Sequence, residues 1–440
     1  MTTFTNPVTG QWSAWKNILF RFFFIYFLLG ILPIGDLSSL PVWKYIQSGY
    51  NSMIDSVANL VDRHLLHIQP PPGVPLPVND GAGDTSHFWA QLWVMALLSA
   101  IGCLVWSLVD RRRENYQRLG YYLRTAFRYY IAWECFVYGV MKIFCLQMWA
   151  PDLSQLATPL GDFGPMRMAW MYMGYGSPYE VFAGVAEVVA GLLLLYRRTV
   201  TLGLLAAMGV FINVVMMNLS YDIPVKGFSM VLALCCLVLL VWDQQRLFSF
   251  LGLNQTTGGT RLYEPVDTGR GMRIARWVLK LCFIYIVIAQ CVYKDAKWYR
   301  DLHKPAVAGP LRSGVYTVRV FAVNNDTIPP SFLDSTRWKD IVFEGRLAYG
   351  SVNSPDTSFA RKYGYGRGMF HYETDSIAHL LTITSKHHPI LECRYELPDS
   401  NTVILRGRLQ QDSVYIVLQR SNHEFQLSEW QFHWVSEANR

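Results

Sequence analysis

The sequence predicts a membrane-spanning all-α helical bundle followed by a C-terminal antiparallel β-barrel or sandwich. Of its 440 residues, 52% are hydrophobic and 16% are charged, whereas soluble domains carry about 25% charged residues. Long apolar runs extend to about residue 298, and from residue 299 short runs alternate apolar and polar residues. The first pattern is typical of transmembrane helices and the second of half-buried strands.

Seven apolar runs approach the ~20 residues that a helix needs to cross the hydrocarbon layer. They lie near 17–35, 88–109, 126–149, 180–196, 199–218, 226–242 and 274–293. We expect the first run to be an uncleaved span rather than a signal peptide, because Arg21 lies inside it and it has no clear cleavage site.

Basic residues at alternate ends of these runs predict the orientation. They follow the second run (111–113) and the fourth (197–198), and they surround the start of the seventh (270–280). Cytoplasmic loops carry an excess of Lys and Arg, so we expect a cytoplasmic N-terminus and an extracytoplasmic C-terminal region.

The loops divide the chain further. Residues 42–68 have the spacing of an amphipathic helix, ended by the proline-rich 69–77. We expect the apolar loop 150–179 to re-enter or cap the bundle. The predicted domains are two N-terminal spans with their outer loop, a four-helix core, a linker with the seventh span, and a β domain, at 1–122, 123–245, 246–298 and 299–440.

Charged residues inside the third run require an explanation. Glu134, Tyr138 and Lys142 recur every four residues and therefore share one face of a helix. A charge at the bilayer centre costs about 2.5–3.5 kcal/mol on insertion scales. We therefore expect this face to point into the protein.

Neighbouring runs offer further polar side chains. Glu187 lies on one face with Gly184 and Gly191, small residues that let another helix approach closely. We expect Asn213 to face the same interior, and Asn218, Asp222 and Lys226 to gather at its outer mouth. Two interpretations remain open: a functional polar pocket, or a buried ion pair of Lys142 with Glu134 or Glu187 that fixes helix register.

Several kinds of site are not expected. All ten histidines lie outside the apolar runs, so we expect no haem held by two histidines in the membrane. We expect no metal site, since the histidines of the β domain are more typical of solvated loops. Only Cys393 of the eight cysteines lies beyond residue 298, so no disulfide framework can hold the β domain. Nothing in the sequence favours nucleic-acid binding.

Three segments together resemble the DoxX family of four-helix membrane proteins: YGVMKIFCLQM (138–148), GPMRMAWMYMGYGSPYEVFAGVAEVVAGLLLLYRRT (164–199) and NVVMMNLSYDIPVK (213–226). The resemblance covers about 125–245. The matching polar and aromatic positions include Tyr138, Lys142, Gln147, Trp170, Glu187, Asn213, Asn218, Asp222 and Lys226. It implies a DoxX-like core in a bacterial inner membrane, extended by extra spans and a periplasmic β domain. The core is also similar to the membrane part of vitamin K-dependent carboxylases.

We therefore expect an integral membrane protein whose polar intramembrane pocket binds a membrane lipid or a quinone-like ligand. Its head group would be held chiefly by Glu134, Lys142, Glu187 and Asn213. The resemblance, whose namesakes are linked to quinone chemistry, implies one alternative, a quinone-linked oxidoreductase with a quinone as cofactor. A second alternative is a non-catalytic scaffold whose β domain, residues 299–440, recruits an envelope protein. Whether the protein is an enzyme stays open.

Overall fold

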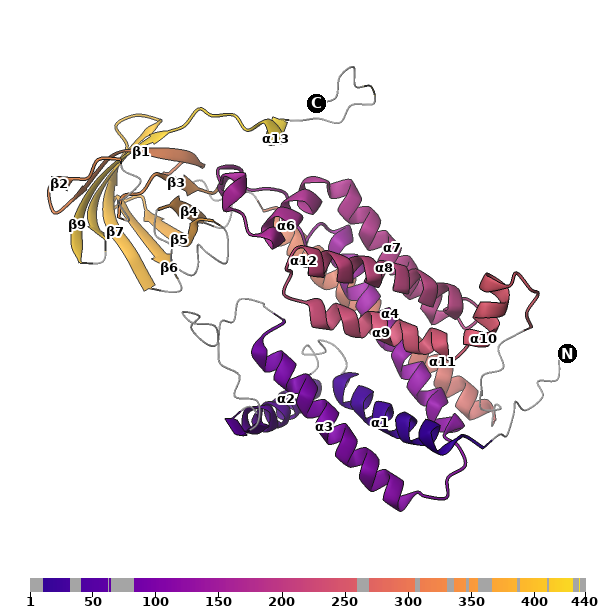
Figure 1. The fold of residues 1–440 in the computed structure, drawn as a ribbon. Coiled ribbons are helices and arrows are strands. Elements are labelled where there is room, and N and C mark those ends of the chain that lie inside the picture. Colours follow the sequence, from indigo (N-terminus) through magenta and orange to yellow (C-terminus); the bar gives the residue numbers. More distant parts are fainter. Residues whose placement is uncertain are drawn as a thin grey trace. The chain divides into compact units, whose positions relative to one another are not determined.

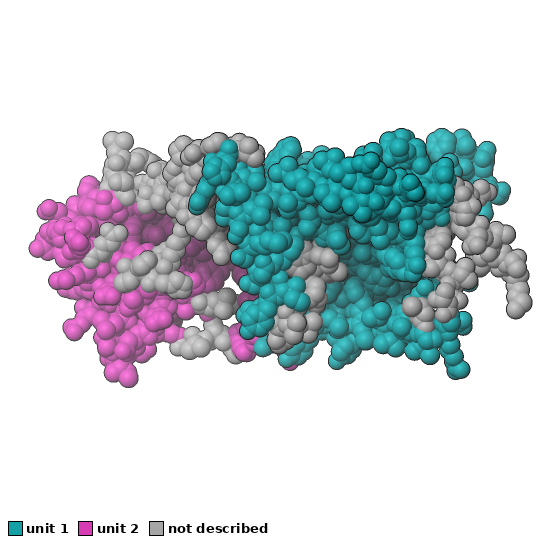
Figure 2. All heavy atoms as spheres, turned by 90° about the horizontal axis from the view of Figure 1, so that it is seen from below, with its two compact units in different colours: residues 1–147, 178–297 teal, residues 148–177, 298–440 magenta. Residues whose placement is uncertain are grey.

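The computed structural model describes residues 11–31, 41–61, 63–64, 83–258, 269–304, 309–330, 336–345, 348–354, 366–385, 388–409, 411–429 and 435. The chain forms two compact units, residues 1–147 with 178–297 and residues 148–177 with 298–440 (Figure 2). The proline-rich segment 69–77 and most of the second half of the 243–273 linker lie outside the described residues.

The first unit is helical (Figure 1). Its elements are α1 (Ala14–Ile31), α2 (Pro41–Val61), α3 (Ser86–Val109), α4 (Gln117–Ile143), α7 (Ser177–Leu195), α8 (Val200–Ser220), α9 (Lys226–Val241), α10 (Gln244–Leu247), η3 (Phe248–Gly252), α11 (Arg270–Ile284), η4 (Tyr285–Ala289) and most of α12 (Gln290–Leu302), whose last residues belong to the second unit. Each of the seven predicted runs contains a helix.

Four helical segments of the described chain are long and apolar enough to cross a membrane: Ser86–Val109, Ser177–Leu195, Val200–Ser220 and Arg273–Leu302. A fifth candidate is α9 together with the segment Gln244–Gly252, which is bent from it by 80°. Helix α4 carries Arg, Glu and Lys along its length. The predicted number of seven spans therefore stays a prediction.

Arg21 shows how this unit accommodates a charge inside an apolar helix. Its guanidinium is buried and donates to the Tyr116 hydroxyl at 2.8 Å, Ser107 Oγ at 2.9 Å and the Asp110 carbonyl at 2.7 Å. Because buried polar groups must be hydrogen-bonded to be tolerated, these bonds tie α1 to α3 and to the turn after α3.

The start of α9 is capped by a residue distant in sequence. Asp84 accepts hydrogen bonds from the backbone amides of Lys226, at 2.6 Å, and Gly227, at 2.9 Å. The amides of Gly83 and Asp84 in turn donate to the Pro224 carbonyl. A carboxylate in this position satisfies first-turn amides and complements the positive end of the helix dipole.

The second unit is a closed antiparallel barrel (Figure 1). Its strands are β1 (Gly314–Val323), β2 (Asp326–Thr327), β3 (Asp340–Phe343), β4 (Tyr349–Asn353), β5 (Gly368–Asp375), β6 (Leu380–Ser385), β7 (His388–Glu396), β8 (Thr402–Leu409) and β9 (Asp412–Arg420). Strands β1 and β3–β9 pair in that order, and β1 also pairs with β9. Because the first and last strands pair, the sheet is closed. This confirms the predicted barrel and excludes the alternative of a β-sandwich.

Side chains fill the barrel. Alternate residues of the strands, including Phe321, Ile341, Leu391, Leu405 and Ile416, are fully buried in one apolar cluster. This agrees with the interior of an eight-stranded barrel, which is just wide enough for side chains. Cys393 lies in the same cluster, where burial raises the pKa of its thiol to about 12.

Residues 148–177 form one compact unit with the strands, whereas we expected this loop to re-enter or cap the helical bundle. They include α5 (Leu153–Leu156), η2 (Leu160–Asp162) and α6 (Pro165–Tyr175); a last helix, α13 (Gln426–Glu429), follows the barrel. The physical reason is a set of hydrogen bonds between α5 and the barrel, described below.

We predict that Asp84→Ala lowers the free energy of unfolding by about 1–2 kcal/mol, the usual cost of losing a helix cap. Asp84→Asn, which keeps an acceptor, should cost less. The measurement is the unfolding midpoint in mild detergent. Asp222→Asn is the control, because the Asp222 side chain is 81% exposed, its pairing with Lys226 is of the weak surface kind, and Asn tolerates the positive φ of this position. Equal midpoints for Asp84→Ala and wild type would contradict the capping role.

Candidate functional site

A buried ion pair joins α4 and α7. Lys142 Nζ donates to both carboxylate oxygens of Glu187, at 2.8 and 2.9 Å. Both side chains are less than a tenth exposed. The sequence allowed either Glu134 or Glu187 as the partner of Lys142. In the described structure the partner is Glu187, and Glu134 forms no ion pair with Lys142.

Two glycines bring the backbones of α4 and α7 into contact beside this pair. A Cβ added to Gly184 would lie 2.6 Å from the Gly139 carbonyl oxygen, and a Cβ on Gly139 would lie 2.9 Å from that of Gly184. Gly191, two turns after Gly184, faces Cys135 of α4. The predicted small-residue face is confirmed, and it leaves no room for a ligand head group between the two helices at this level.

A second polar feature of α4 is a ladder of three side chains, Tyr130, Glu134 and Tyr138, spaced four residues apart. Tyr130 and Glu134 are buried and Tyr138 is half-buried. Within the described residues, neither the Glu134 carboxyl nor the two phenol hydroxyls has a hydrogen-bond or ion-pair partner. This ladder thus differs from Lys142, which continues the same face but is ion-paired with Glu187.

Aromatic contacts locate the ladder in the bundle. The Tyr138 ring packs against Phe228 of α9, with ring centres 5.9 Å apart. On the adjoining side of α4, Phe283 of α11 contacts Tyr129 and Trp133, at 4.8 and 6.4 Å. Helix α9 therefore contacts the ladder itself, and α11 contacts residues of α4 that directly precede two members of the ladder. The sequence analysis missed Tyr130, although it lies one further step of four before Glu134.

Three predicted residues form a separate cluster where α8 turns into α9. Asn218 donates to Ser229 Oγ at 3.0 Å and to the Val225 carbonyl at 3.3 Å. Lys226 pairs with Asp222 at 2.7 Å and lies 3.8 Å from Asp84. These contacts fix the turn between the two helices.

The remaining predicted residues do not join either cluster. Asn213 lies on the exposed face of α8, so it does not reach the Lys142–Glu187 pair as we expected. Gln147 is half-buried, and its Oε1 has no hydrogen-bond partner in the described structure. Trp170 lies on α6 in the other compact unit.

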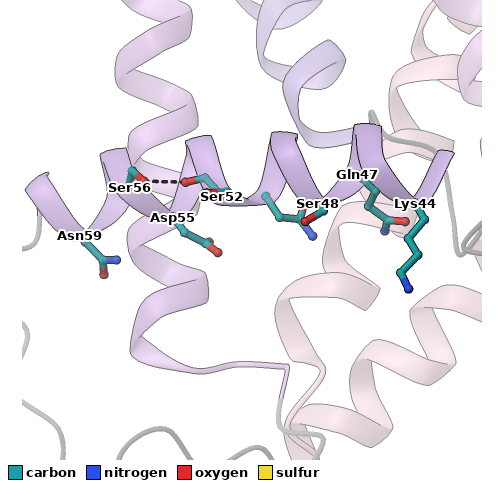
Figure 3. A pocket seen from close by; sticks show the side chains of 8 residues that line it. Lys44, Gln47, Ser48, Ser52, Asp55, Ser56 and Asn59 are labelled. Atoms are coloured by element: carbon teal, nitrogen blue, oxygen red, sulfur yellow. Dashed lines mark hydrogen bonds between the residues drawn. The ribbon is translucent and has the colours of Figure 1, made fainter. Parts of the chain in front are cut away.

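A pocket runs along the polar face of α2 (Figure 3). Lys44, Gln47, Ser48, Ser52, Asp55 and Ser56 are among its lining residues and all lie on this one helix. The predicted amphipathic character of this segment is thus confirmed over Pro41–Val61. Asp55 also contacts His87 and Gln91 of α3, at 3.0 and 2.7 Å. The open pocket lies away from the buried charges, and we give it no chemical role.

The second unit contains a buried polar network that the sequence did not predict. The Ser154 amide and hydroxyl both donate to Glu344, each at 2.8 Å, and Ser351 Oγ donates to Ser154 Oγ at 2.8 Å. Arg367, which is 1% exposed, donates to Ser351 at 2.8 Å and pairs with Asp340. The network joins α5 to strands β4 and β5 and to the end of β3.

The partners of Glu344 set its ionisation. Burial, reinforced by the nearby charge of Asp152, raises the pKa of the Glu344 carboxyl above its ordinary 4.5, against the lowering effect of the Ser154 hydrogen bonds. All of these groups have structural partners, so the network acts as an attachment for residues 148–177 rather than as a reactive centre.

Comparison with known proteins identifies one informative relative. The chain is 32% identical over 151 residues to the uncharacterized protein YwoB of Bacillus subtilis (strain 168). The aligned part is 34% of this chain and 88% of YwoB. No family model matches the chain, and no solved structure matches it.

We predict that breaking the α4–α7 ion pair is costly and that removing both charges is not. Lys142→Met or Glu187→Leu alone should lower the free energy of unfolding by about 3–5 kcal/mol, because each leaves an uncompensated buried charge. The double variant should regain most of this loss. Unfolding midpoints in detergent test the idea, and a double variant no more stable than the singles would contradict it.

We also predict a pH dependence from Glu344. The raised pKa means that the folded state holds this proton more tightly than the unfolded state. The stability of the barrel should therefore fall as pH rises from 4.5 through the raised pKa. Glu344→Gln keeps an acceptor for Ser154 and should flatten this slope. Amide hydrogen exchange of the barrel strands in the full chain reports the stability of the barrel, and an unchanged slope in the variant would refute the assignment.

Proposed function

The chain belongs to the same family as YwoB of Bacillus subtilis, and we propose that it is an integral membrane protein that binds an amphipathic ligand beside Glu134. The ligand class is a membrane lipid or a quinone, each with an apolar body and an oxygen-bearing head. The binding groups are the Glu134 carboxyl and the hydroxyls of Tyr130 and Tyr138.

The observation that supports this proposal most is the unpartnered Glu134. Its side chain is buried in the bundle, and none of the described residues hydrogen-bonds it. A buried polar group without a partner costs about 1–3 kcal/mol by mutational data. A ligand carbonyl or hydroxyl at this position would supply the missing bond, and the two phenols flanking Glu134 offer further donors.

Lys142 and Glu187 have a different role in this proposal from the one expected of them. Because Lys142 already donates to both Glu187 oxygens, it has less to offer a head group than Glu134 does. The pair instead holds α4 at a fixed height and rotation against α7. It thereby positions the ladder, which begins one turn away at Tyr138.

The placement in the membrane is also part of the proposal. The apolar helices and the basic residues at alternate ends support an inner-membrane protein with a cytoplasmic N-terminus and an extracytoplasmic, periplasmic barrel. Helices α4, α7, α8 and α9 supply the four helices of the proposed DoxX-like core. A quinone-linked oxidoreductase would use the same site and is distinguished by a redox difference spectrum.

A second candidate function is a scaffold whose barrel recruits an envelope protein. The apolar side chains that pack inside the described part of the barrel favour it, because such a barrel offers its outer surface for recognition. In this case the charged residues of α4 only hold the helices of the bundle in position and bind no ligand.

The experiment is native mass spectrometry with lipid extraction on the full chain, purified in mild detergent. We expect a stoichiometric lipid or quinone on wild type, less of it on Glu134→Gln and none on Glu134→Leu. Glu114→Gln, a change at an exposed glutamate, should match wild type. Tyr138→Phe, which removes only a hydroxyl, should weaken retention and serves if Glu134→Leu fails to fold. An empty wild-type protein, or equal retention by Glu134→Leu, would exclude the proposed site and leave the scaffold.

A further inference from the structure

Helix α8 presents an exposed face that contains a single amide. The outward residues include Leu202, Leu205, Ile212 and Met216, all more than a third exposed, and Asn213 is exposed among them. The opposite face of the helix packs into the bundle through Leu204, Ala207, Phe211 and Asn218. The helix is apolar overall and meets the criteria for a membrane span.

Asn213 lies near the middle of this span. The helix has 21 residues, so Asn213 is three residues from its centre, or about 4.5 Å along the axis. No described residue hydrogen-bonds the amide. A carboxamide facing hydrocarbon at this depth has no solvent to bond, and each unmet group costs free energy.

A glycine next to the amide leaves room for another helix. Gly209 precedes Asn213 by four residues and so lies on the same face. A Cβ built on Gly209 meets nothing within 4 Å. A small residue beside a polar one on a lipid-facing helix allows close backbone approach together with an interhelical hydrogen bond.

We propose that this face of α8 is the contact between two copies of this chain, with Asn213 of each copy hydrogen-bonded to Asn213 of the other. The proposal rests on the membrane placement proposed above, but not on the ligand site. A carboxamide is both donor and acceptor, so it is complementary to itself. A two-fold axis beside α8 places the same residue of each copy opposite the other, and two amides then satisfy one another without a second kind of residue.

The test is the monomer–dimer equilibrium of the full chain in mild detergent, followed by light scattering over a range of protein-to-detergent ratios. We expect wild type to dimerise. Asn213→Leu should raise the dissociation constant on the order of tenfold, the range of intramembrane side-chain hydrogen bonds. Gly209→Ile should raise it at least as much, because its side chain separates the helices. Leu237→Ala, on the exposed face of α9, is the control and should dimerise as wild type does.

Ligand retention is measured on the same samples, so that the two proposals are tested separately. Asn213→Leu should keep the bound ligand, and Glu134→Leu should keep the dimer. A wild type that stays monomeric at every ratio would overturn the proposal, as would an Asn213→Leu protein that dimerises like wild type. A monomer whose α8 face is occupied by another membrane protein would also overturn it.

Discussion

The bundle depends on every buried charge having a partner, and between α4 and α7 Lys142 and Glu187 meet this requirement for one another. Taking two charges out of water is costly, and their attraction offsets that cost only when the geometry is good and the remaining hydrogen-bonding capacity is used. Here both carboxylate oxygens accept from one ammonium group. Lys142 can reach Glu187 because the backbones of α4 and α7 are in direct contact at Gly139 and Gly184, which have no side chains. A side chain at either glycine would separate the helices and break the pair.

The same requirement explains the other buried polar groups. Arg21 has three acceptors from α3 and its following turn, Asn218 holds α8 to α9, and Asp84 caps α9. In the barrel unit, Arg367 lies between Asp340 and Ser351. Among the described residues, the exceptions include Arg128 Nε and Gln147 Oε1, the Glu134 carboxyl with its two neighbouring phenols, and the exposed Asn213 amide. The two proposals above give partners to two of these groups, a ligand for Glu134 and a second copy of the chain for Asn213.

The sequence predicted those features that follow from local periodicity. Alternation of apolar and polar residues beyond residue 298 predicted the strands, and the step of four from Glu134 to Lys142 predicted a shared helix face. The choice between barrel and sandwich was left open because it depends on the pairing of β1 with β9, about 100 residues apart.

Other features depend on the rotation and docking of elements, which the sequence does not encode locally. Helix α8 is apolar around its whole circumference, so no pattern indicated that Asn213 points outward. The attachment of 148–177 to the barrel rests on Ser154 and Glu344, which are 190 residues apart. Tyr130 could have been predicted from the sequence, since it lies four residues before Glu134 and so continues the spacing that identified Glu134, Tyr138 and Lys142.

The most direct test of the account is a cryo-electron microscopy structure of the wild-type chain in lipid nanodiscs, at a resolution that separates side chains from bound lipid. The account predicts density that does not belong to the protein, ending at the Glu134 carboxyl between Tyr130 and Tyr138, with Lys142 bound to Glu187. A Glu134 carboxyl bonded to a protein donor, with side chains of α9 and α11 filling the space around it, would contradict the account.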